Sequence, residues 1–240
     1  MKSKGIGCSE LADVFNLDYG CQRRLFYKKR EYKEDRPRLD DAPLRRGKAL
    51  EAVAVEEYER KTGIKTRKRR TMLESTECPL IGYVDRIVID KVLEIKCPGL
   101  HAFNKVKKEG ISDSYILQLN GYIYLYGQSN FGIFGVFHPD PMEILDFEME
   151  RDLKIIDNIK RGTTELWSMI EGDRPPERLD MGDFRCKKCV YLDTCWQEKA
   201  MTIDGVDPNE EIEDLSQLGQ LYEACKINHD AKEQINCLII

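Results

Sequence analysis

Three charged residues of the sequence, Asp85, Glu94 and Lys96, could act together in catalysis. If the chain reverses at Asp90 and Lys91, alternation along two paired strands puts all three on one face of a sheet. Asp85 would then lie opposite Lys96 and diagonal to Glu94. Two neighbouring carboxylates repel each other unless a cation neutralises them, and their hard oxygen ligands suit Mg²⁺ or Mn²⁺, which can polarise a phosphate and activate water. The alternative is an exposed hairpin that carries an ion pair between Asp85 and Lys96.

The residues around this hairpin predict an α/β fold in which helices flank a mixed central sheet. Runs rich in β-branched residues predict strands at 68–74, 81–89, 92–97 and 131–137. Apolar residues at helical spacing predict helices at 9–32, 44–61, 113–127 and 150–171. With 240 residues, the chain can bury one sizeable core with appendages, whereas two ordinary domains would strain it.

Three polar residues on the predicted helices could assist the charged group. Gln118 and Tyr122 are four residues apart, so they share one face of the helix that follows the strands. Glu51 follows Gly47 by four residues on the helix that precedes the strands. By periodicity alone, Tyr122 fits the aromatic core equally well, and Glu51 fits an exposed helix position.

The cysteines form a second group with possible chemistry. The chain has nine cysteines, an odd number that favours clustered metal ligands over a set of disulfides. Cys186-x2-Cys189-x5-Cys195 places three thiols within ten residues, and Cys21 is the candidate for a fourth. Four thiolates can hold zinc or an iron-sulfur cluster, and spacing alone favours zinc. A redox-active dithiol is a third interpretation, and the remaining cysteines are expected to be small buried packing residues.

The distribution of charge favours a phosphate-containing partner in spite of the net charge of -5. Residues 201–240 contain nine acidic and two basic residues, which leaves the preceding 200 residues at +2. Basic side chains concentrate at 23–38 and 61–70. A solvated surface is the ordinary explanation of one such run, but two runs beside one candidate site favour a phosphate backbone. The acidic tail is expected to form a helix that begins near Asp207 and Pro208.

The motifs on the hairpin and on the following helix resemble those of a nuclease superfamily. Asp85-x8-Glu94-x-Lys96, preceded by a glycine, resembles the PD-(D/E)XK signature. The run Glu94-Ile-Lys96, followed by Cys-Pro and by Gln118 downstream, is similar to the branch that contains RecB, lambda exonuclease and viral recombinases. The resemblance implies a restriction-endonuclease-like core and a nuclease activity.

The same resemblance implies roles for individual residues. It implies that the divalent metal is held by Glu51, Asp85, Glu94 and the backbone carbonyl of Ile95. Lys96 would position the attacking water. Gln118 and Tyr122 resemble the Gln-x3-Tyr motif of RecB-type nucleases and would support the site. Many relatives carry a histidine at the position of Glu51, which is a departure of this chain from the pattern.

The cysteine pattern resembles that of the iron-sulfur exonucleases associated with CRISPR systems and of AddB-type nuclease domains, over residues 8–200. It implies a 4Fe-4S cluster on Cys21, Cys186, Cys189 and Cys195, in a small subdomain that joins the N- and C-terminal segments. The implied organisation is a basic helical segment at 1–43, a nuclease core at 44–175, a cysteine-rich segment at 176–200 and an acidic C-terminal helix at 201–240.

The function implied by the resemblance is a metal-dependent exonuclease that acts on DNA ends, single-stranded or tailed double-stranded. Recombination, repair, viral replication and CRISPR adaptation are the implied settings, and ring-forming relatives imply a homo-oligomer. The C-terminal helix is a candidate contact for a recombination or CRISPR-adaptation protein. The sequence shows neither an 18-residue apolar stretch nor a signal peptide, so we expect a cytoplasmic protein without a membrane partner.

Two alternatives from other functional classes stay open. The first is a non-catalytic nucleic-acid-binding or adaptor protein on a nuclease-like fold with a zinc site. The second is a zinc-stabilised structural module whose acidic tail recruits a helicase or recombinase. Loss of metal binding on removal of Asp85 and Glu94 would distinguish the nuclease from the first, and deletion of 207–240 would test the second.

Overall fold

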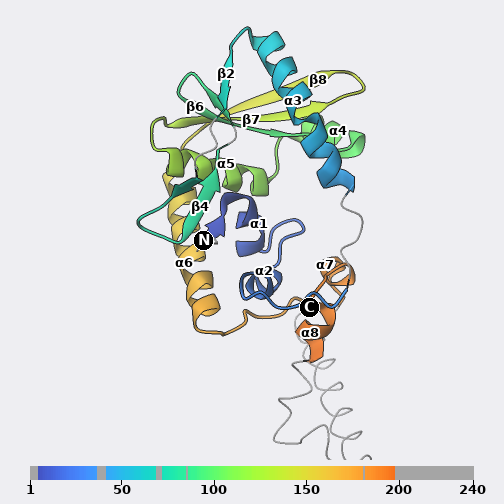
Figure 1. Ribbon diagram of the computed structural model, residues 1–240, viewed down its shortest axis with the longest axis vertical. Coiled ribbons are helices and arrows are strands. Elements are labelled where there is room, and N and C mark those ends of the chain that lie inside the picture. The colour runs from blue at the N-terminus through green and yellow to red at the C-terminus, as the bar shows by residue number, and fades with distance from the viewer. Residues whose placement is uncertain (1–4, 37–41, 69–71, 85, 181, 198–240) are drawn as a thin grey trace, which may run out of the picture. The chain divides into compact units, whose positions relative to one another are not determined.

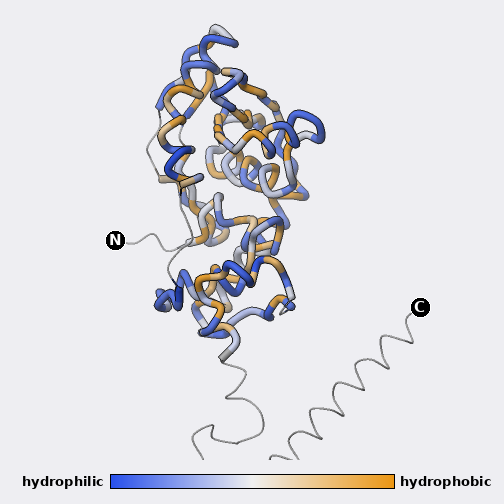
Figure 2. Tube along the Cα trace, turned by 90° about the vertical axis from the view of Figure 1, so that its right-hand side faces the viewer, coloured by the Kyte–Doolittle hydropathy of each residue, from blue (hydrophilic) through white to orange (hydrophobic). Residues whose placement is uncertain are grey.

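A computed structural model gives the fold of residues 5–36, 42–68, 72–84, 86–180 and 182–197. The chain divides into two compact units, Met1–Leu192 and Asp193–Ile240, and residues 193–197 are the described part of the second. Hydrophobic and hydrophilic residues are interleaved along the helices (Figure 2), and among the described residues no helix is long and apolar enough to cross a membrane. Asp85 and the predicted tail helix lie outside the described residues.

A five-stranded sheet forms the centre of the first unit. Its strands, in spatial order, are β2 (Thr66–Lys68), β5 (Arg86–Val88), β6 (Lys91–Lys96), β7 (Phe131–His138) and β8 (Glu143–Glu150). Neighbouring strands are antiparallel except β6 and β7, which run parallel. The expected mixed sheet is therefore confirmed, although β8 was not predicted.

Helices α3 (Ala42–Thr62) and α5 (Asp113–Tyr126) cover opposite faces of this sheet (Figure 1). Ala54 and Tyr58 of α3 pack with Leu93 of β6 in one buried cluster. On the other face, the ring of Tyr115 in α5 stacks on Phe134 of β7 with centroids 4.6 Å apart. Because successive strand residues alternate between faces, the residue after Leu93 points toward α5.

A second, three-stranded sheet lies against α5. It consists of β1 (Ile6–Gly7), β4 (Leu80–Tyr83) and β3 (Met72–Glu74), in the order β1-β4-β3. The strands expected at 68–74 and 81–89 are therefore each divided between the two sheets. Gly82 lets β4 approach α5 closely, because a Cβ at this position would lie 3.0 Å from the Tyr122 ring and 3.0 Å from the Cys8 sulfur.

The N-terminal segment is broken where one helix over 9–32 was expected. It forms the 3-10 turn η1 (Cys8–Glu10) and the helices α1 (Leu11–Val14) and α2 (Gln22–Lys29). The chain reverses between the two helices, where Asn16 and Asp18 have positive φ angles of 51° and 49°. Only glycine fits at position 20, because a Cβ there would lie 1.9 Å from the Ala12 carbonyl oxygen.

The remaining helices complete the described chain. They are α4 (Leu100–Glu109), α6 (Leu153–Glu171), α7 (Phe184–Lys187) and α8 (Leu192–Gln197). Helix α6, which begins with the Asp152 carboxylate accepting the backbone N–H groups of Lys154 and Ile155, packs on α5, α1 and α2. The helices expected at 44–61, 113–127 and 150–171 are confirmed, whereas α4 was not predicted.

Candidate active site

The pairing of β5 with β6 fixes the face on which Glu94 and Lys96 lie. Val88 pairs with Lys91 and Arg86 pairs with Leu93, so the turn consists of residues 89–90. The expected turn at 90–91 is wrong by one residue, and the expected pairing is wrong by two. Because side chains alternate with a period of two, a two-residue shift leaves each side chain on its expected face.

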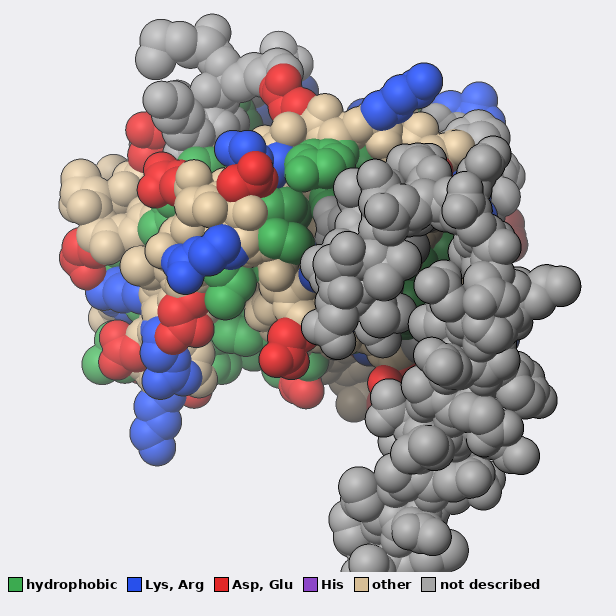
Figure 3. Space-filling view, turned by 90° about the horizontal axis from the view of Figure 1, so that it is seen from below, with side chains coloured by type: hydrophobic (Ala, Val, Ile, Leu, Met, Phe, Trp, Pro, Cys, Tyr) green, Lys and Arg blue, Asp and Glu red, His purple; other side chains and the backbone are tan. Residues whose placement is uncertain are grey.

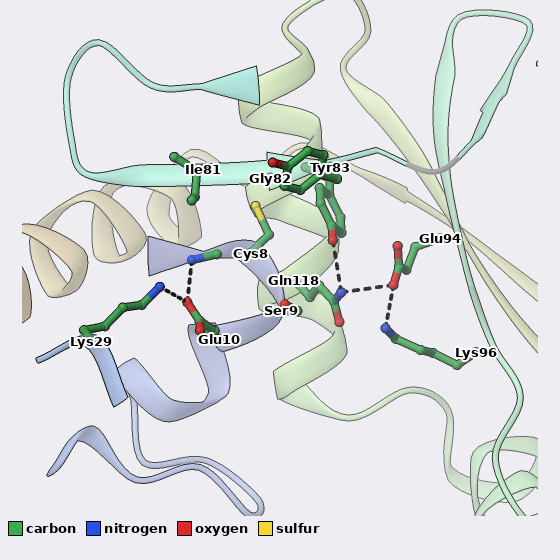
Figure 4. Close-up of a pocket in the computed structure, with 12 residues that line it drawn as sticks. Cys8, Ser9, Glu10, Lys29, Ile81, Gly82, Tyr83, Glu94, Lys96 and Gln118 are labelled. Carbon is green, nitrogen blue, oxygen red and sulfur yellow. Dashed lines mark hydrogen bonds and ion pairs between the residues drawn. The ribbon is translucent and has the colours of Figure 1, made fainter. Parts of the chain in front are cut away.

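Glu94, Lys96 and Gln118 converge on the α5 side of the sheet (Figure 4). Glu94 is only 5% exposed. The ammonium nitrogen of Lys96 lies 2.5 Å from Oε1 of Glu94, and Nε2 of Gln118 donates to the same oxygen at 3.0 Å. Nε2 of Gln118 also lies 3.4 Å from the Tyr122 hydroxyl. A buried carboxylate is costly unless charge and hydrogen bonds compensate it, and these two donors supply that compensation.

The Glu94–Lys96 pair borders two pockets. One, of about 420 Å³, extends toward the N-terminal segment and is also lined by Ser9, Lys29 and Gln118. The other, of about 650 Å³, extends toward the start of α3 and the β6–α4 loop, and it is also lined by Glu51 and Ile95. A substrate that extended from one pocket into the other would therefore run beside the Glu94–Lys96 pair.

The oxygen ligands around this pair fit a hard divalent cation in chemistry. Glu94 and Glu51 supply carboxylates to the larger pocket, and the backbone of Ile95 borders it. Within the described residues, no group of three His, Cys, Asp or Glu side chains lies close enough to hold a metal. Asp85, the other expected carboxylate, is outside them.

Comparison with known proteins agrees with this architecture. Residues 1–129 match the YqaJ-like viral recombinase domain family. The chain belongs to this family. The uncharacterized protein YqaJ of Bacillus subtilis (strain 168) is 27% identical over 134 residues, which are 54% of this chain and 42% of that protein. The YqaJ-like chain thus spans about two fifths of the length of this relative.

Solved structures similar to the YqaJ-like chain include exonucleases. LHK-Exo in complex with dAMP superposes with a TM-score of 0.60 at 22% identity, covering 72% of this chain and 90% of that one. A second structure of this alkaline exonuclease from Laribacter hongkongensis gives 0.59 at 21% identity, with 72% and 91% covered. A phage-related exonuclease from Haemophilus somnus 129PT gives 0.53 at 17% identity, with 70% and 96% covered. These likenesses support the expected PD-(D/E)XK-like fold.

Residues 184–192, the part of the cysteine segment in the first unit, lie against the loop between α1 and α2. Arg185 of α7 donates to the carbonyl oxygens of Asn16 and Gly20 at 2.7 and 3.1 Å. Its ion pair with Asp183 raises the pKa of the guanidinium, and the nearby thiols of Cys21 and Cys186 add to this effect. Arg185 therefore holds the segment of Cys186 beside that of Cys21.

The four expected cluster ligands are not gathered into one metal site within the part of the chain that the structure describes. Cys21, Cys186, Cys189 and Cys195 are all partly exposed and form no disulfide. Their thiol chemistry suits iron or zinc. Cys195 belongs to the second unit, so the expected subdomain stays a prediction.

Much of the first basic run is used inside the fold. Lys28 and Lys29 both bind the carboxylate of Glu10, at 2.7 and 2.6 Å. Arg23 is buried and donates to the Pro176 carbonyl at 2.6 Å. On the face drawn in Figure 3, the described basic and acidic side chains are interspersed.

Sequence reasoning missed two basic residues that line the larger pocket, Arg46 and Lys48. They flank Gly47, the first residue of the Gly47-x3-Glu51 motif, which is the signal that could have identified them. It also missed Glu10 in the smaller pocket, because the contact of Glu10 with Lys29 joins η1 to α2 across the chain reversal.

Proposed function

We propose that this chain is a divalent-metal-dependent nuclease that hydrolyses phosphodiester bonds at DNA ends. The observation that carries the proposal is the convergence of Lys96 and Gln118 on the buried carboxylate of Glu94, where two pockets meet. The fold shared with an alkaline exonuclease and a phage-related exonuclease supports it. The dAMP in the LHK-Exo structure supports a deoxynucleotide substrate.

In this proposal, Mg²⁺ or Mn²⁺ would be held by Asp85, Glu94, Glu51 and the Ile95 carbonyl. The cation would supply Lewis-acid activation of the phosphate and a lowered pKa of bound water. Buried Glu94 contributes a fixed negative charge, because Gln118 restrains the position of its carboxylate. Tyr122 in turn lies within 3.4 Å of Gln118 and supports the amide.

Lys96 is proposed to act on the attacking water and on the reacting phosphate. Its ammonium group can donate a hydrogen bond to the oxygen of water and so orient the lone pair toward phosphorus. It also stabilises the negative charge that develops on the phosphate oxygens as the P–O ester bond breaks. Its ion pair with Glu94 keeps the ammonium group beside the scissile position.

We also propose that Cys21, Cys186, Cys189 and Cys195 hold a 4Fe-4S cluster, with zinc as the alternative. Support comes from the spacing of the three late cysteines and from Arg185, which joins their segment to the loop before Cys21. The proposed role is structural, and no catalytic step depends on it. The acidic tail as a contact for recombination or CRISPR-adaptation proteins, a homo-oligomeric state and a cytoplasmic location stay predictions.

End-labelled DNA provides the test of the nuclease proposal. Wild type should degrade it with Mg²⁺ or Mn²⁺ and not with EDTA, and Lys96→Ala should reduce the rate by about 10²- to 10³-fold, as for loss of one preorganised electrostatic contact. Lys91→Ala is the matched control, since this lysine of the same strand pairs with Glu148. Full activity in Lys96→Ala would contradict the assignment. Metal-independent binding without cleavage by wild type would favour the adaptor hypothesis.

A further inference from the structure

The start of α3 forms one wall of the larger active-site pocket. Arg46, Lys48 and Glu51 line this pocket from α3, while Glu94 and Lys96 line it from β6. The positions of Arg46 and Lys48, two residues apart on the helix, place two cations beside the proposed reaction site. Their charge is of the sign that attracts a phosphate.

The Arg46 guanidinium lies beside Gly99. A Cβ at Gly99, in the β6–α4 loop, would lie 3.5 Å from Nη2 and 4.0 Å from Nη1 of Arg46. The guanidinium thus reaches from α3 to the loop that follows Lys96. Arg46 and Lys96 therefore border one pocket, together with Cys97 and Gly99 of that loop.

Arg46 differs from several basic residues of the two runs in its lack of an internal partner. Lys29 binds Glu10, and Lys61 binds Asp146. Arg46 forms no hydrogen bond or ion pair with the residues that the structure describes, and the same holds for Lys48. A guanidinium presents five donors in a planar fork that matches two phosphate oxygens. An unpaired fork at the edge of a nuclease pocket is suited to the substrate backbone.

We propose that Arg46 binds a phosphate of the DNA strand on the α3 side of the Glu94–Lys96 pair, next to the scissile phosphate. This inference rests on the proposed nuclease function and adds a residue that positions its substrate. Gly99 contributes to this contact, because a larger side chain at position 99 would occupy the space of the Arg46 guanidinium. Lys48 adds charge without the two-point geometry of the fork.

Binding without catalysis tests Arg46 separately from cleavage. The affinity for a fluorescein-labelled single-stranded oligonucleotide is measured by anisotropy in EDTA at several salt concentrations. Arg46→Gln should weaken binding about 10-fold or more, the range for a hydrogen bond to a charged group. It should also reduce the salt slope by about 0.7, the value for one phosphate contact on a single strand. Arg46→Lys should lie between wild type and Arg46→Gln.

Matched changes at two other positions keep this test independent of folding. Arg45→Gln removes the same charge from the neighbouring residue on α3, which is exposed and does not line the pocket, and it should change the slope less. Gly99→Leu should reproduce the defect with Arg46 intact, whereas Gly99→Ala makes an ordinary contact and should bind as wild type.

The outcomes separate the two proposals. Equal affinity and slope for wild type and Arg46→Gln would overturn the role of Arg46, whether or not wild type cleaves DNA. A weakened Arg46→Gln together with a wild type that never cleaves would support the phosphate contact and reject the nuclease. A wild type that binds no oligonucleotide in EDTA would overturn the role of Arg46, and the nuclease proposal would be decided by the metal-dependent cleavage assay alone.

Discussion

Two regions of the molecule bring reactive side chains together by different means: the Glu94–Lys96 pair of β6 and the segment of Cys186 and Cys189. Glu94 and Lys96 are two residues apart on one strand, so the backbone alone puts them on one face. Cys186 and Cys189 lie on and after a four-residue helix, and Arg185 secures this segment through hydrogen bonds to loop carbonyls.

This contrast predicts which of the two regions would depend on a bound metal for its stability. The active-site carboxylate already has an ammonium group and an amide as partners, so the site is ordered by the protein. The cysteine segment has short helices and few regular backbone hydrogen bonds, so a shared ion or cluster would supply part of its folding free energy. Removing the metal should therefore lower the stability of the cysteine segment, whereas at Glu94 it should lower activity.

The largest expected effect comes from the cysteines. Cys186→Ser should abolish bound iron or zinc and lower the free energy of unfolding by several kcal/mol, below the roughly 10–16 kcal/mol that zinc supplies to domains that fold only with metal. Anaerobic purification, measurement of iron, acid-labile sulfide and zinc, and denaturant unfolding would show this. Cys78→Ser is the control, because this buried cysteine lies outside the motif.

The same measurements could also show that the cysteine segment does not depend on a metal. If wild type carries no metal and Cys186→Ser unfolds at the same denaturant concentration, the cysteine segment is held by Arg185 and its neighbours alone. Zinc without sulfide would support a structural metal on these cysteines, with zinc in place of the iron-sulfur cluster. Iron and sulfide in equal amounts would support the 4Fe-4S proposal.

An intermediate effect is expected at Gln118. Gln118→Leu removes the 3.0 Å hydrogen bond to Glu94, and loss of a residue that orients a metal ligand typically costs about 10- to 100-fold in metal affinity or activity. Tyr122→Phe removes only the 3.4 Å contact and should cost less. Titration of Mn²⁺ in the cleavage assay would measure both. A Gln118→Leu protein with wild-type kcat and metal affinity would show that Glu94 needs no such support.

The sequence predicts the site best where the interacting residues share one element. Glu94 and Lys96 share a strand, and Gln118 and Tyr122 share a helix, so spacing alone sets their common face. The hydrogen bond between Gln118 and Glu94 then requires only that α5 pack on that face. Arg46 beside Gly99 was beyond such reasoning, because it depends on how α3 meets the β6–α4 loop.

The fold was predicted least well where the chain changes sheets. β-branched residues continue across 81–89, so no local signal divides β4 from β5. The turn was misplaced because Ile89 adopts a φ of 58°, a left-handed conformation that β-branched residues rarely occupy. In the N-terminal segment, the positive φ of Asp18 and the closeness of Gly20 to α1 break a pattern that looks helical in sequence.

The smallest expected effect concerns Glu10, which ties η1 to α2 at the smaller pocket. Burial raises the pKa of this carboxyl, but hydrogen bonds from Lys28, Lys29 and the Gly7 N–H outweigh it and lower the pKa below its usual value. A lowered folded-state pKa contributes stability above the unfolded-state pKa, and this contribution is lost as the pH falls through the folded-state pKa.

Glu10→Gln should therefore lower the free energy of unfolding by about 1–3 kcal/mol at neutral pH, the range for charged hydrogen bonds, and by less in acid. Urea unfolding at several pH values from neutral to acidic would measure the difference between variant and wild type. Asp173→Asn is the matched control. The ion pair of Asp173 with Arg30, at 2.9 Å, is exposed and should contribute little to the free energy of unfolding. A difference for Glu10→Gln that stays constant with pH would mean that the variant loses packing rather than charge. In that case η1 would be held to α2 mainly by packing, unlike the segment of Cys186, which the charged side chain of Arg185 holds to two loop carbonyls.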